Sequence, residues 1–275
     1  MLKDGRGAAS HPRPRDREKG TSVTHCPVAV QLYSVRNALE TDPVGTIDRI
    51  AEIGYQAVEA GFKYLTTYPE LVDAIHRHGF ETPTLTSPLF EVADREPVWA
   101  LAERLGSHTV IETFIPEEHW TSVADVDHIA AELNDAAAQA AAHGLRVGYH
   151  NHWWELETIF EGRRAMELLI ERLNPEIVLE PDVYWVTVGG EDPVEFVRRH
   201  AERVRFLHLK DGPVNHDNTQ QQPAGQGAIP IRALLETAVN LEGGVVEFDE
   251  YCGDIFDAIA QAHAYLTDLV AQVKA

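Results

Sequence analysis

The sequence predicts one α/β domain in which eight parallel strands alternate with helices and close into a barrel. Three observations favour this fold class. The chain of 275 residues has about the length of such a barrel, for which roughly 250 residues are typical. Eight β-type segments alternate with helical segments along the chain. Several of these β-type segments begin apolar and become charged toward their C-terminal ends, which meet at one mouth of a barrel.

The N-terminal segment differs from the rest of the chain. Residues 5–20 are rich in Arg, Pro and Gly and contain almost no large apolar side chain. Such a composition buries too little apolar surface to fold. We therefore expect residues 1–25 to form a disordered tail and residues 26–275 to form the barrel. The segment also lacks the apolar stretch of a secretory signal.

The expected strands alternate with helical segments, several of which end in glycine. Glycine adopts the left-handed conformation that ends a helix. The four glycines that follow a helical segment and precede a strand are Gly54, Gly79, Gly106 and Gly144. The expected strands are residues 28–33, 57–61, 82–86, 109–114, 146–150, 177–182, 205–210 and 245–248. Eight right-handed βα units of this kind close into a (β/α)8 TIM barrel.

An open, doubly wound sheet is the alternative fold class. That fold needs a Gly-rich turn after its first strand to hold phosphates. The corresponding segment here, residues 31–36 (QLYSVR), contains no glycine. We therefore favour the barrel.

The helices have recognisable starts. Asp42, Asp192 and Glu96 each stand directly before a proline. A carboxylate accepts hydrogen bonds from the free N–H groups of a helix start, and proline fits the first helical position. The clearest helix is expected over residues 127–143, which are dense in alanine, and the last over residues 255–270.

The longest segment without expected secondary structure is residues 211–229. It contains His216, three glutamines and the sequence Gly225-Gln226-Gly227. Loops of this length in compact domains are usually functional or disordered. We expect an active-site lid, and a plain mobile loop is the alternative.

The amino-acid composition disfavours nucleic-acid-binding, membrane-spanning and disulfide-rich proteins. The chain has 23 Lys and Arg against 44 Asp and Glu, a formal net charge of −21, which disfavours nucleic acid as a partner. No run of about 18 apolar residues is present, so no membrane span is expected. The two cysteines, Cys26 and Cys252, do not form a disulfide framework and suit the reducing cytoplasm.

Three potential metal ligands occur at equivalent depths of three successive strands. Alone, each has an ordinary explanation: Asp182 a solvated carboxylate, His208 a core histidine, Glu247 one partner of a buried ion pair. Together, two carboxylates and an imidazole suit one divalent metal, with Mn²⁺ favoured and Mg²⁺, Co²⁺ or Zn²⁺ as alternatives. Such a set leaves positions open for a substrate.

The fifth strand should supply a fourth ligand. His150 and His152 project from the same face of that strand, and Glu155 follows just past its end. Each of the three could bind metal. We favour Glu155 as the ligand and the two histidines for proton transfer or substrate binding, because a neutral imidazole titrates near working pH.

In combination and in order, six motifs of this chain resemble those of the sugar phosphate isomerase/epimerase family, within the xylose-isomerase-like TIM-barrel superfamily. The likeness extends from about residue 28 to the C-terminus. The matching motifs are residues 30–36 (VQLYSVR), 148–155 (GYHNHWWE), 182–186 (DVYWV), 208–212 (HLKDG), 225–227 (GQG) and 247–250 (EFDE).

The resemblance implies an eight-stranded barrel with one divalent metal at its mouth, held by Asp182, His208 and Glu247. One departure matters, because enzymes similar to tagatose 3-epimerase carry Glu on the fifth strand, where this chain has His150. Members with the His-Asn-His form look closer to enzymes of keto-sugars or keto-inositols, lyases included. Residues expected to bind the substrate are Gln31, Tyr33, Arg36, Glu59 and Trp185.

The leading functional hypothesis is a metal-dependent sugar isomerase or epimerase that removes a proton next to a keto-sugar carbonyl. His150 or His152 would take the proton, and Lys210 could assist the developing oxyanion. A lyase or dehydratase acting on a 3-keto-glycoside or keto-inositol is the alternative, since it shares the first step. An endonuclease IV-like phosphodiesterase and a non-catalytic partner subunit have less support. The expected substrate is a small unphosphorylated sugar, and barrels of this type often form homodimers.

Overall fold

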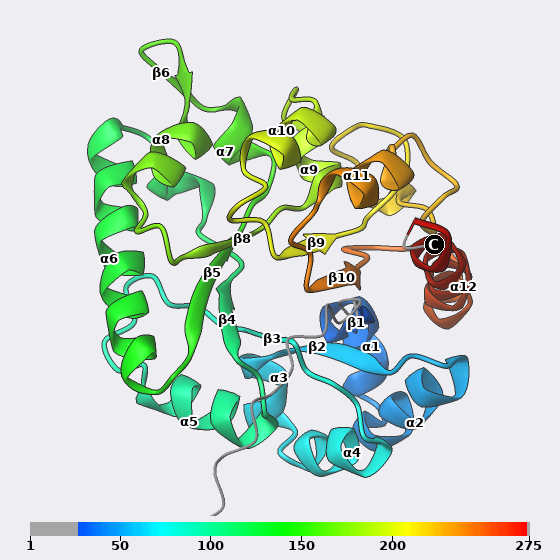
Figure 1. Ribbon diagram of the computed structural model, residues 1–275. Helices are drawn as coiled ribbons and strands as arrows, with labels where there is room; N and C mark the ends of the chain where they lie inside the picture. Colours follow the sequence, from blue (N-terminus) through cyan, green and yellow to red (C-terminus); the bar gives the residue numbers. More distant parts are fainter. Residues whose placement is uncertain (1–26, 274–275) are drawn as a thin grey trace, which may run out of the picture.

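The computed structural model describes residues 27–273. The expected N-terminal tail, residues 1–25, lies outside these residues. The main sheet has eight strands, and helices surround it (Figure 1). These strands are β1 (Val28–Gln31), β2 (Ala57–Gly61), β3 (Thr84–Thr86), β4 (Thr109–Glu112), β5 (Arg146–His150), β8 (Val178–Glu180), β9 (Phe206–His208) and β10 (Gly243–Val246).

Helices follow the strands along the chain. The α-helices are α1 (Arg36–Leu39), α2 (Pro43–Ile53), α3 (Phe62–Thr67), α4 (Glu70–His78), α5 (Glu96–Leu105), α6 (Val123–Ala142), α7 (Trp154–Glu157), α8 (Ala165–Arg172), α9 (Val183–Val188), α10 (Pro193–Arg199), α11 (Ile231–Thr237) and α12 (Ile255–Val273). Three short 3₁₀ helices are η1 (Leu32–Val35), η2 (Glu117–His119) and η3 (Asn218–Gln220). A small antiparallel hairpin pairs β6 (Ile159–Phe160) with β7 (Arg163–Arg164).

The main sheet closes on itself. Its strands are parallel neighbours in the order β8-β5-β4-β3-β2-β1-β10-β9. Between the two end strands, the Leu179 N–H donates to the Arg203 carbonyl at 2.8 Å and the His208 N–H donates to the Pro181 carbonyl at 3.0 Å. The predicted (β/α)8 barrel is therefore confirmed.

Most element boundaries follow from local chemistry. β2 and β5 have their expected bounds. The four expected glycines end their helical segments with positive φ, from 68° at Gly79 to 109° at Gly54. Asp42 and Asp192 cap α2 and α10 through their side chains. Glu96 does not cap a helix: it is the first residue of α5, and Asp94 accepts its N–H.

Strand ends differ from expectation where the chain turns into a loop or helix. β1 stops at Gln31, because the next four residues form η1. Asp182 and Lys210 lie past the ends of β8 and β9 and not inside them. These shorter strands place the polar residues at the rim of the barrel, where they face the mouth.

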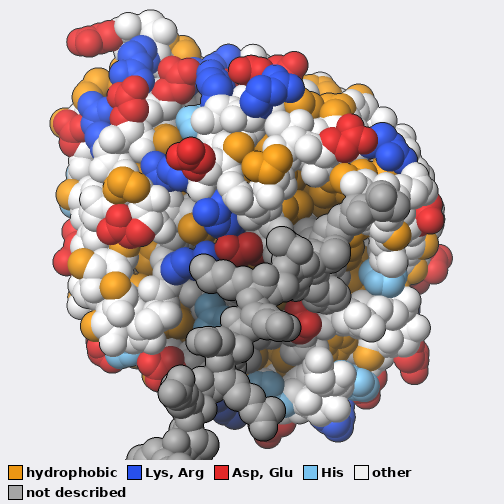
Figure 2. Space-filling model, viewed as in Figure 1, with side chains coloured by type: hydrophobic (Ala, Val, Ile, Leu, Met, Phe, Trp, Pro, Cys, Tyr) orange, Lys and Arg blue, Asp and Glu red, His pale blue; other side chains and the backbone are white. Residues whose placement is uncertain are grey.

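Charged side chains of both signs are interspersed over the face of the molecule in Figure 2. Some charged side chains of the molecule form ion pairs, such as Arg146 and Glu242, whose Nη2 and Oε2 atoms lie 2.6 Å apart. No helix within residues 27–273 combines the length and apolar character needed to cross a membrane.

Candidate active site

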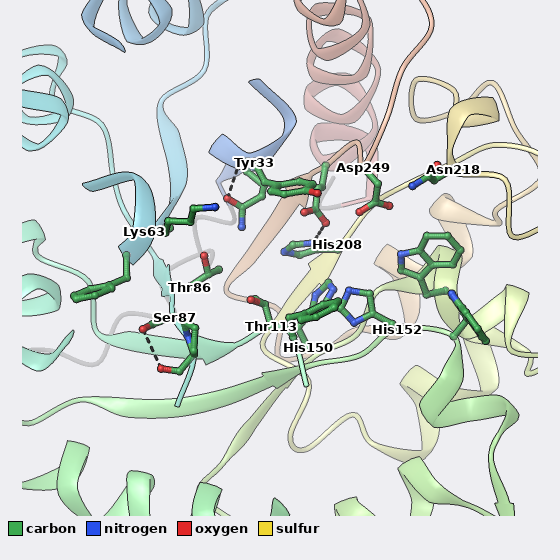
Figure 3. Close-up of a pocket in the computed structure, with 18 of the residues that line it drawn as sticks. Tyr33, Lys63, Thr86, Ser87, Thr113, His150, His152, His208, Asn218 and Asp249 are labelled. Atoms are coloured by element: carbon green, nitrogen blue, oxygen red, sulfur yellow. Dashed lines mark hydrogen bonds and ion pairs between the residues drawn. The ribbon is translucent and has the colours of Figure 1, made fainter. Parts of the chain in front are cut away.

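A cavity of about 560 Å³ opens at the carboxyl-terminal ends of the strands. In Figure 3, His208 lies between Tyr33 and Asp249 on one side and His150 and His152 on the other. Aromatic rings form much of the wall, among them Tyr33, Phe62, Phe114, Trp153, Trp154 and Trp185. Such a wall suits a small organic ring whose polar groups are recognised at a few points.

Four potential ligands from four successive strands meet beside the cavity. They are His150, Asp182, His208 and Glu247, and one ligand atom from each lies within 4.8 Å of the others. Their exposed fractions are 3%, 0%, 1% and 8%. The Nδ1 atom of His208 is 2.7 Å from Oε2 of Glu247, and Nε2 of His150 is 3.9 Å from Oδ2 of Asp182. Nitrogen and oxygen donors in this arrangement fit a divalent transition metal.

Asp182 links the cluster to the start of α9. Its Oδ1 accepts hydrogen bonds from the N–H groups of Tyr184 and Trp185, both at 3.0 Å. The carboxylate therefore caps the helix with one oxygen and turns the other, Oδ2, toward the cluster. Burial raises the pKa of Asp182 to about 6, against the opposing effect of nearby Lys210.

Lys210 is the cation of the cluster. Its Nζ lies 2.9 Å from Oδ2 of Asp182, 2.8 Å from Oε2 of Glu247 and 2.8 Å from Oδ2 of Asp249. Burial alone would lower the pKa of Lys210, but these three carboxylates outweigh it and raise the pKa well above its usual range. The ammonium group is thus a fixed positive charge surrounded by carboxylates.

The two histidines of the fifth strand both line the cavity. The His152 ring stacks on Trp154, with centroids 4.3 Å apart and planes 5° from parallel. Burial, followed by the charge of Lys210, lowers the pKa of His152 to about 3. Burial also lowers the pKa of His150 well below its usual value, and His208 adds to this effect. Both rings are therefore neutral at physiological pH.

Glu155, the expected fourth ligand, lies outside the four-residue cluster. Its carboxylate accepts hydrogen bonds from the Tyr149 hydroxyl at 2.9 Å and the His152 backbone N–H at 3.0 Å. Burial raises its pKa to about 8. The structure brings His150, and not Glu155, next to Asp182, and Glu155 instead holds the backbone turn that carries His152.

Of the five residues expected to bind substrate, three line the cavity and two, Arg36 and Glu59, do not. Gln31, Tyr33 and Trp185 line the cavity. Arg36 stacks over the Tyr33 ring, 4.2 Å from its centroid, and pairs with Glu250, so it acts on the cavity wall through Tyr33. Glu59 is fully buried, with its Oε1 2.8 Å from Nε2 of His208.

Several residues of the site were not among the site residues expected from the sequence. Asp249 and Lys63 line the cavity, and each follows an expected strand end by one or two residues, which was the available signal. Glu180 of β8 is fully buried, with its Oε2 3.4 Å from Nε2 of His208. Burial, followed by the charge of Glu59, raises the pKa of Glu180 well above its usual value.

The loop over residues 211–229 is fastened at both ends by Asp211. The Asp211 carboxylate accepts the backbone N–H groups of Gly212, Gly225, Gly227 and Ile229 at 2.9 to 3.0 Å. Between these anchors, His216 and Asn218 reach the cavity. The glycine pair 225 and 227 thus serves as a turn around a carboxylate.

Proteins of known function are similar to this chain in sequence. A 28% identical relative is an inosose dehydratase of Geobacillus kaustophilus, matched over 204 residues, or 62% of each chain. An inosose dehydratase 1 of Bacillus cereus is 30% identical over 136 residues, 49% of this chain and 42% of the relative. The first of these matches spans about three fifths of the curated relative's length.

Solved structures share the fold. A sugar phosphate isomerase/epimerase of Parabacteroides distasonis superposes with a TM-score of 0.73 at 20% identity, covering 96% of this chain and 100% of the other. A xylose isomerase-like TIM barrel protein of Mycobacterium smegmatis in complex with magnesium gives a TM-score of 0.69 at 14% identity, covering 92% and 99%. The family model described as xylose isomerase-like TIM barrel matches residues 47–249, and the chain belongs to that family.

Proposed function

We propose that the protein is a metal-dependent dehydratase that acts on a cyclic keto-polyol, either a keto-inositol or a keto-sugar. The observation that carries the proposal is geometric: the His152 imidazole lines the cavity beside a four-residue cluster able to hold a metal. The similarity to inosose dehydratases supports the same reaction class.

His150, Asp182, His208 and Glu247 would hold the divalent metal. The two imidazoles favour a transition metal such as Zn²⁺ or Co²⁺, and the two carboxylates also suit Mn²⁺, whereas Mg²⁺ prefers an all-oxygen shell. When bound, such a metal supplies Lewis-acid stabilisation of the negative charge that develops on a carbonyl oxygen. Lys210 keeps Asp182 and Glu247 ionised as ligands by its positive charge.

His152 is the residue that we propose as general base. It takes the proton from the carbon next to the carbonyl, and the electrons of that C–H bond form the enolate. His152 then passes the proton to the hydroxyl group that leaves from the adjacent carbon, so that water and an unsaturated ketone result. One base therefore serves both steps of the elimination.

An isomerase is the second candidate, because His152 could return the same proton to the neighbouring carbon. Epimerisation needs a second acid/base group on the opposite side of the substrate. The carboxylate that faces His152 across the cavity, Asp249 (Figure 3), is paired with Lys210 at 2.8 Å. This pairing favours elimination over epimerisation.

The test combines proton exchange with metal binding. Keto-inositols, free ketoses and 3-keto-glycosides are incubated with the Mn²⁺-loaded protein in deuterium oxide, and exchange at the α carbon and loss of water are followed by NMR. We expect His152→Gln to lower turnover by about 10²- to 10⁴-fold while retaining Mn²⁺. His150→Gln should instead weaken Mn²⁺ binding.

His216→Gln is the matched control, because His216 also lines the cavity but pairs with exposed Glu157. It should change turnover by less than either of the other variants. Absence of α-proton exchange on every substrate of the panel would contradict the proposed function. Proton exchange in which the carbonyl moves to the neighbouring carbon, without loss of water, would favour the isomerase.

A further inference from the structure

Glu59 is a carboxylate in the interior of the barrel, on the opposite side of His208 from Glu247. Its Oε1 is 2.8 Å from Nε2 of His208, while Nδ1 of the same ring is 2.7 Å from Oε2 of Glu247. Glu59 is fully buried, and the residues that line the cavity include His208 and Glu247 but not Glu59. A substrate in the cavity would therefore meet the Nδ1 side of the ring.

We propose that Glu59 is a positioning residue for His208: it accepts the Nε2–H hydrogen bond and so holds Nδ1 toward Glu247, on the side of the ring where the divalent cation would bind. The proposal rests on the metal dependence proposed above. A histidine ligand commonly donates its second ring N–H to a carboxylate, which fixes both the ring orientation and the nitrogen that faces the metal.

Neighbouring strands hold the Glu59 carboxylate in place. Gln31 of β1 donates its side-chain N–H to Oε1 at 2.7 Å, and the Thr84 hydroxyl of β3 donates to Oε2. Gln31 and Glu59 are register partners in the sheet. Each carboxylate oxygen thus has a donor from an adjacent strand, so the acceptor presented to His208 has a fixed direction. A buried carboxylate is tolerated only with such partners.

Glu180 offers a second carboxylate near the same nitrogen. Its Oε2 is 3.4 Å from Nε2 of His208, compared with 2.8 Å for Glu59, so the shorter contact favours Glu59 as the main acceptor. Glu59, Glu180 and His208 form a second, deeper group whose ligand atoms lie within 4.8 Å of one another. Glu59 and Glu180 do not line the cavity, so a cation held there would be shielded from substrate.

The experiment measures the affinity for Mn²⁺ alone, by the EPR signal of the free ion, in the full-length protein. Changes of this kind around a metal ligand typically weaken metal binding by about 10- to 100-fold. We expect about 10-fold for Glu59→Gln, which keeps an acceptor but loses the charge, and a larger loss for Glu59→Leu, which removes the acceptor.

Glu112→Gln is the matched control. Glu112 of β4 is an equally buried carboxylate at a strand end, but its partners are the backbone N–H groups of Leu89, Phe90 and Phe114. It should leave the Mn²⁺ affinity unchanged even if it lowers stability. Thr84→Val, which removes one hydrogen bond to Glu59, should give an effect smaller than that of Glu59→Gln.

A spectroscopic readout separates positioning from general stabilisation. In Co²⁺-substituted protein, the ring N–H of a metal-bound histidine gives a shifted, exchangeable proton signal. Labelling of histidine with ¹⁵N identifies these ring N–H signals, and one of them should exchange with solvent faster in Glu59→Gln than in the wild type or in Glu112→Gln.

The variants distinguish a positioning role of Glu59 from the alternatives. Unchanged Mn²⁺ affinity and unchanged proton exchange in both Glu59 variants would overturn the positioning role while leaving the proposed function intact. Loss of affinity in Glu180→Gln but not in Glu59→Gln would also overturn it. If Asp182→Asn retains the affinity that the Glu59 variants lose, the cation occupies the deeper group. A wild-type protein that binds no divalent cation overturns both this inference and the metal dependence.

Discussion

Asp182 performs two tasks with one carboxylate. Oδ1 caps α9 through Tyr184 and Trp185, and Oδ2 faces the cluster and Lys210. The cap restricts rotation of the carboxylate, so the second oxygen is oriented before any cation arrives. The start of the helix also favours the ionised form of the side chain near it.

The dual role predicts that Asp182→Asn separates metal binding from capping. Asn keeps an oxygen for the two N–H groups but loses the charge that a cation needs. We expect Mn²⁺ affinity to fall by more than about 100-fold, beyond the loss typical of residues behind a ligand, measured by titration calorimetry. Asp192→Asn is the control, because Asp192 caps α10 in the same way and does not touch the cluster. Equal affinity in both variants would exclude Asp182 as a ligand.

Glu155 predicts a pH dependence of stability. Its pKa is raised to about 8 from 4.5 by burial, so the folded protein holds this proton more tightly than the unfolded chain does. The associated stability is present below about pH 4.5 and is lost as the pH rises through about 8. Each unit by which the pKa differs between the folded and the unfolded state changes the free energy of unfolding by about 1.4 kcal/mol.

Glu155→Gln should remove this dependence, because the amide is neutral at every pH. Urea unfolding of the metal-free protein between these pH values should show the variant gaining more than about 1 kcal/mol relative to the wild type as the pH rises. The other carboxylates are present in both proteins and cancel in the difference. A constant difference across the range would show that Glu155 titrates normally.

At the scale of elements, one buried carboxylate, Asp211, joins the two ends of the loop after β9. Asp211 is buried and accepts four backbone N–H groups from both ends of the loop. Tyr184 of α9 adds hydrogen bonds to the carbonyls of Pro213 and Asn215. The loop that carries His216 and Asn218 to the cavity is thus held by its base.

Asp211→Ala is predicted to release this loop. A buried donor left without a partner costs about 1–3 kcal/mol, so we expect the free energy of unfolding to fall by about 2–4 kcal/mol, with new protease cleavage between residues 212 and 229. Asp217→Ala provides the comparison, since Asp217 caps exposed η3 in the same loop and should cost less than about 1 kcal/mol. Similar stabilities and cleavage patterns for the two variants would refute the anchoring role.

Local signals predicted the elements well and their contacts less well. Helix ends at Gly54 and Gly79 and the cap at Asp42 follow from backbone chemistry within a few residues, and the structure confirms them. The seventh strand ends at His208 and not at Lys210 as expected, and the Lys210 ammonium group contacts Asp182 and Glu247, which lie just past the ends of β8 and β10. Periodicity along one strand carries no information about partners on other strands.

The same limit applies to the site. Asp182, His208 and Glu247 were identifiable as charged residues at strand ends, and the structure brings them together. The contact of Glu59 with His208 joins residues 149 positions apart, and only the closed barrel creates it. Whether His150 or Glu155 joins the cluster likewise depended on the turn after β5, where Glu155 binds the backbone of His152.

At the scale of the whole molecule, the interior of the barrel is polar near its mouth. Barrels of this class usually fill this layer with branched apolar side chains. Here the buried residues of the layer include Gln31, Glu59, Thr84, His150, Glu180 and His208. A chain gives up apolar packing of this kind mainly at functional sites, which agrees with a site built into the barrel and not only onto its loops.

The net charge of −21 predicts that the protein prefers a neutral substrate over a negatively charged one. Among the described residues that line the cavity, Lys63 is the only Lys or Arg, so a phosphorylated ketose would meet one lysine against a strongly negative molecule. We expect kcat/KM for a phosphorylated ketose to be lower than for the neutral ketose, and to rise as salt screens the repulsion.

The measurement compares the two substrates from about 0.01 M salt, where the Debye length is about 30 Å, to about 0.15 M, where it is about 8 Å. The neutral ketose should show almost no salt dependence. A kcat/KM for the phosphorylated ketose that falls with salt would instead reveal local attraction, and its loss in Lys63→Gln would assign that attraction to Lys63. The sign of the slope therefore distinguishes the field of the whole molecule from a single cation at the cavity.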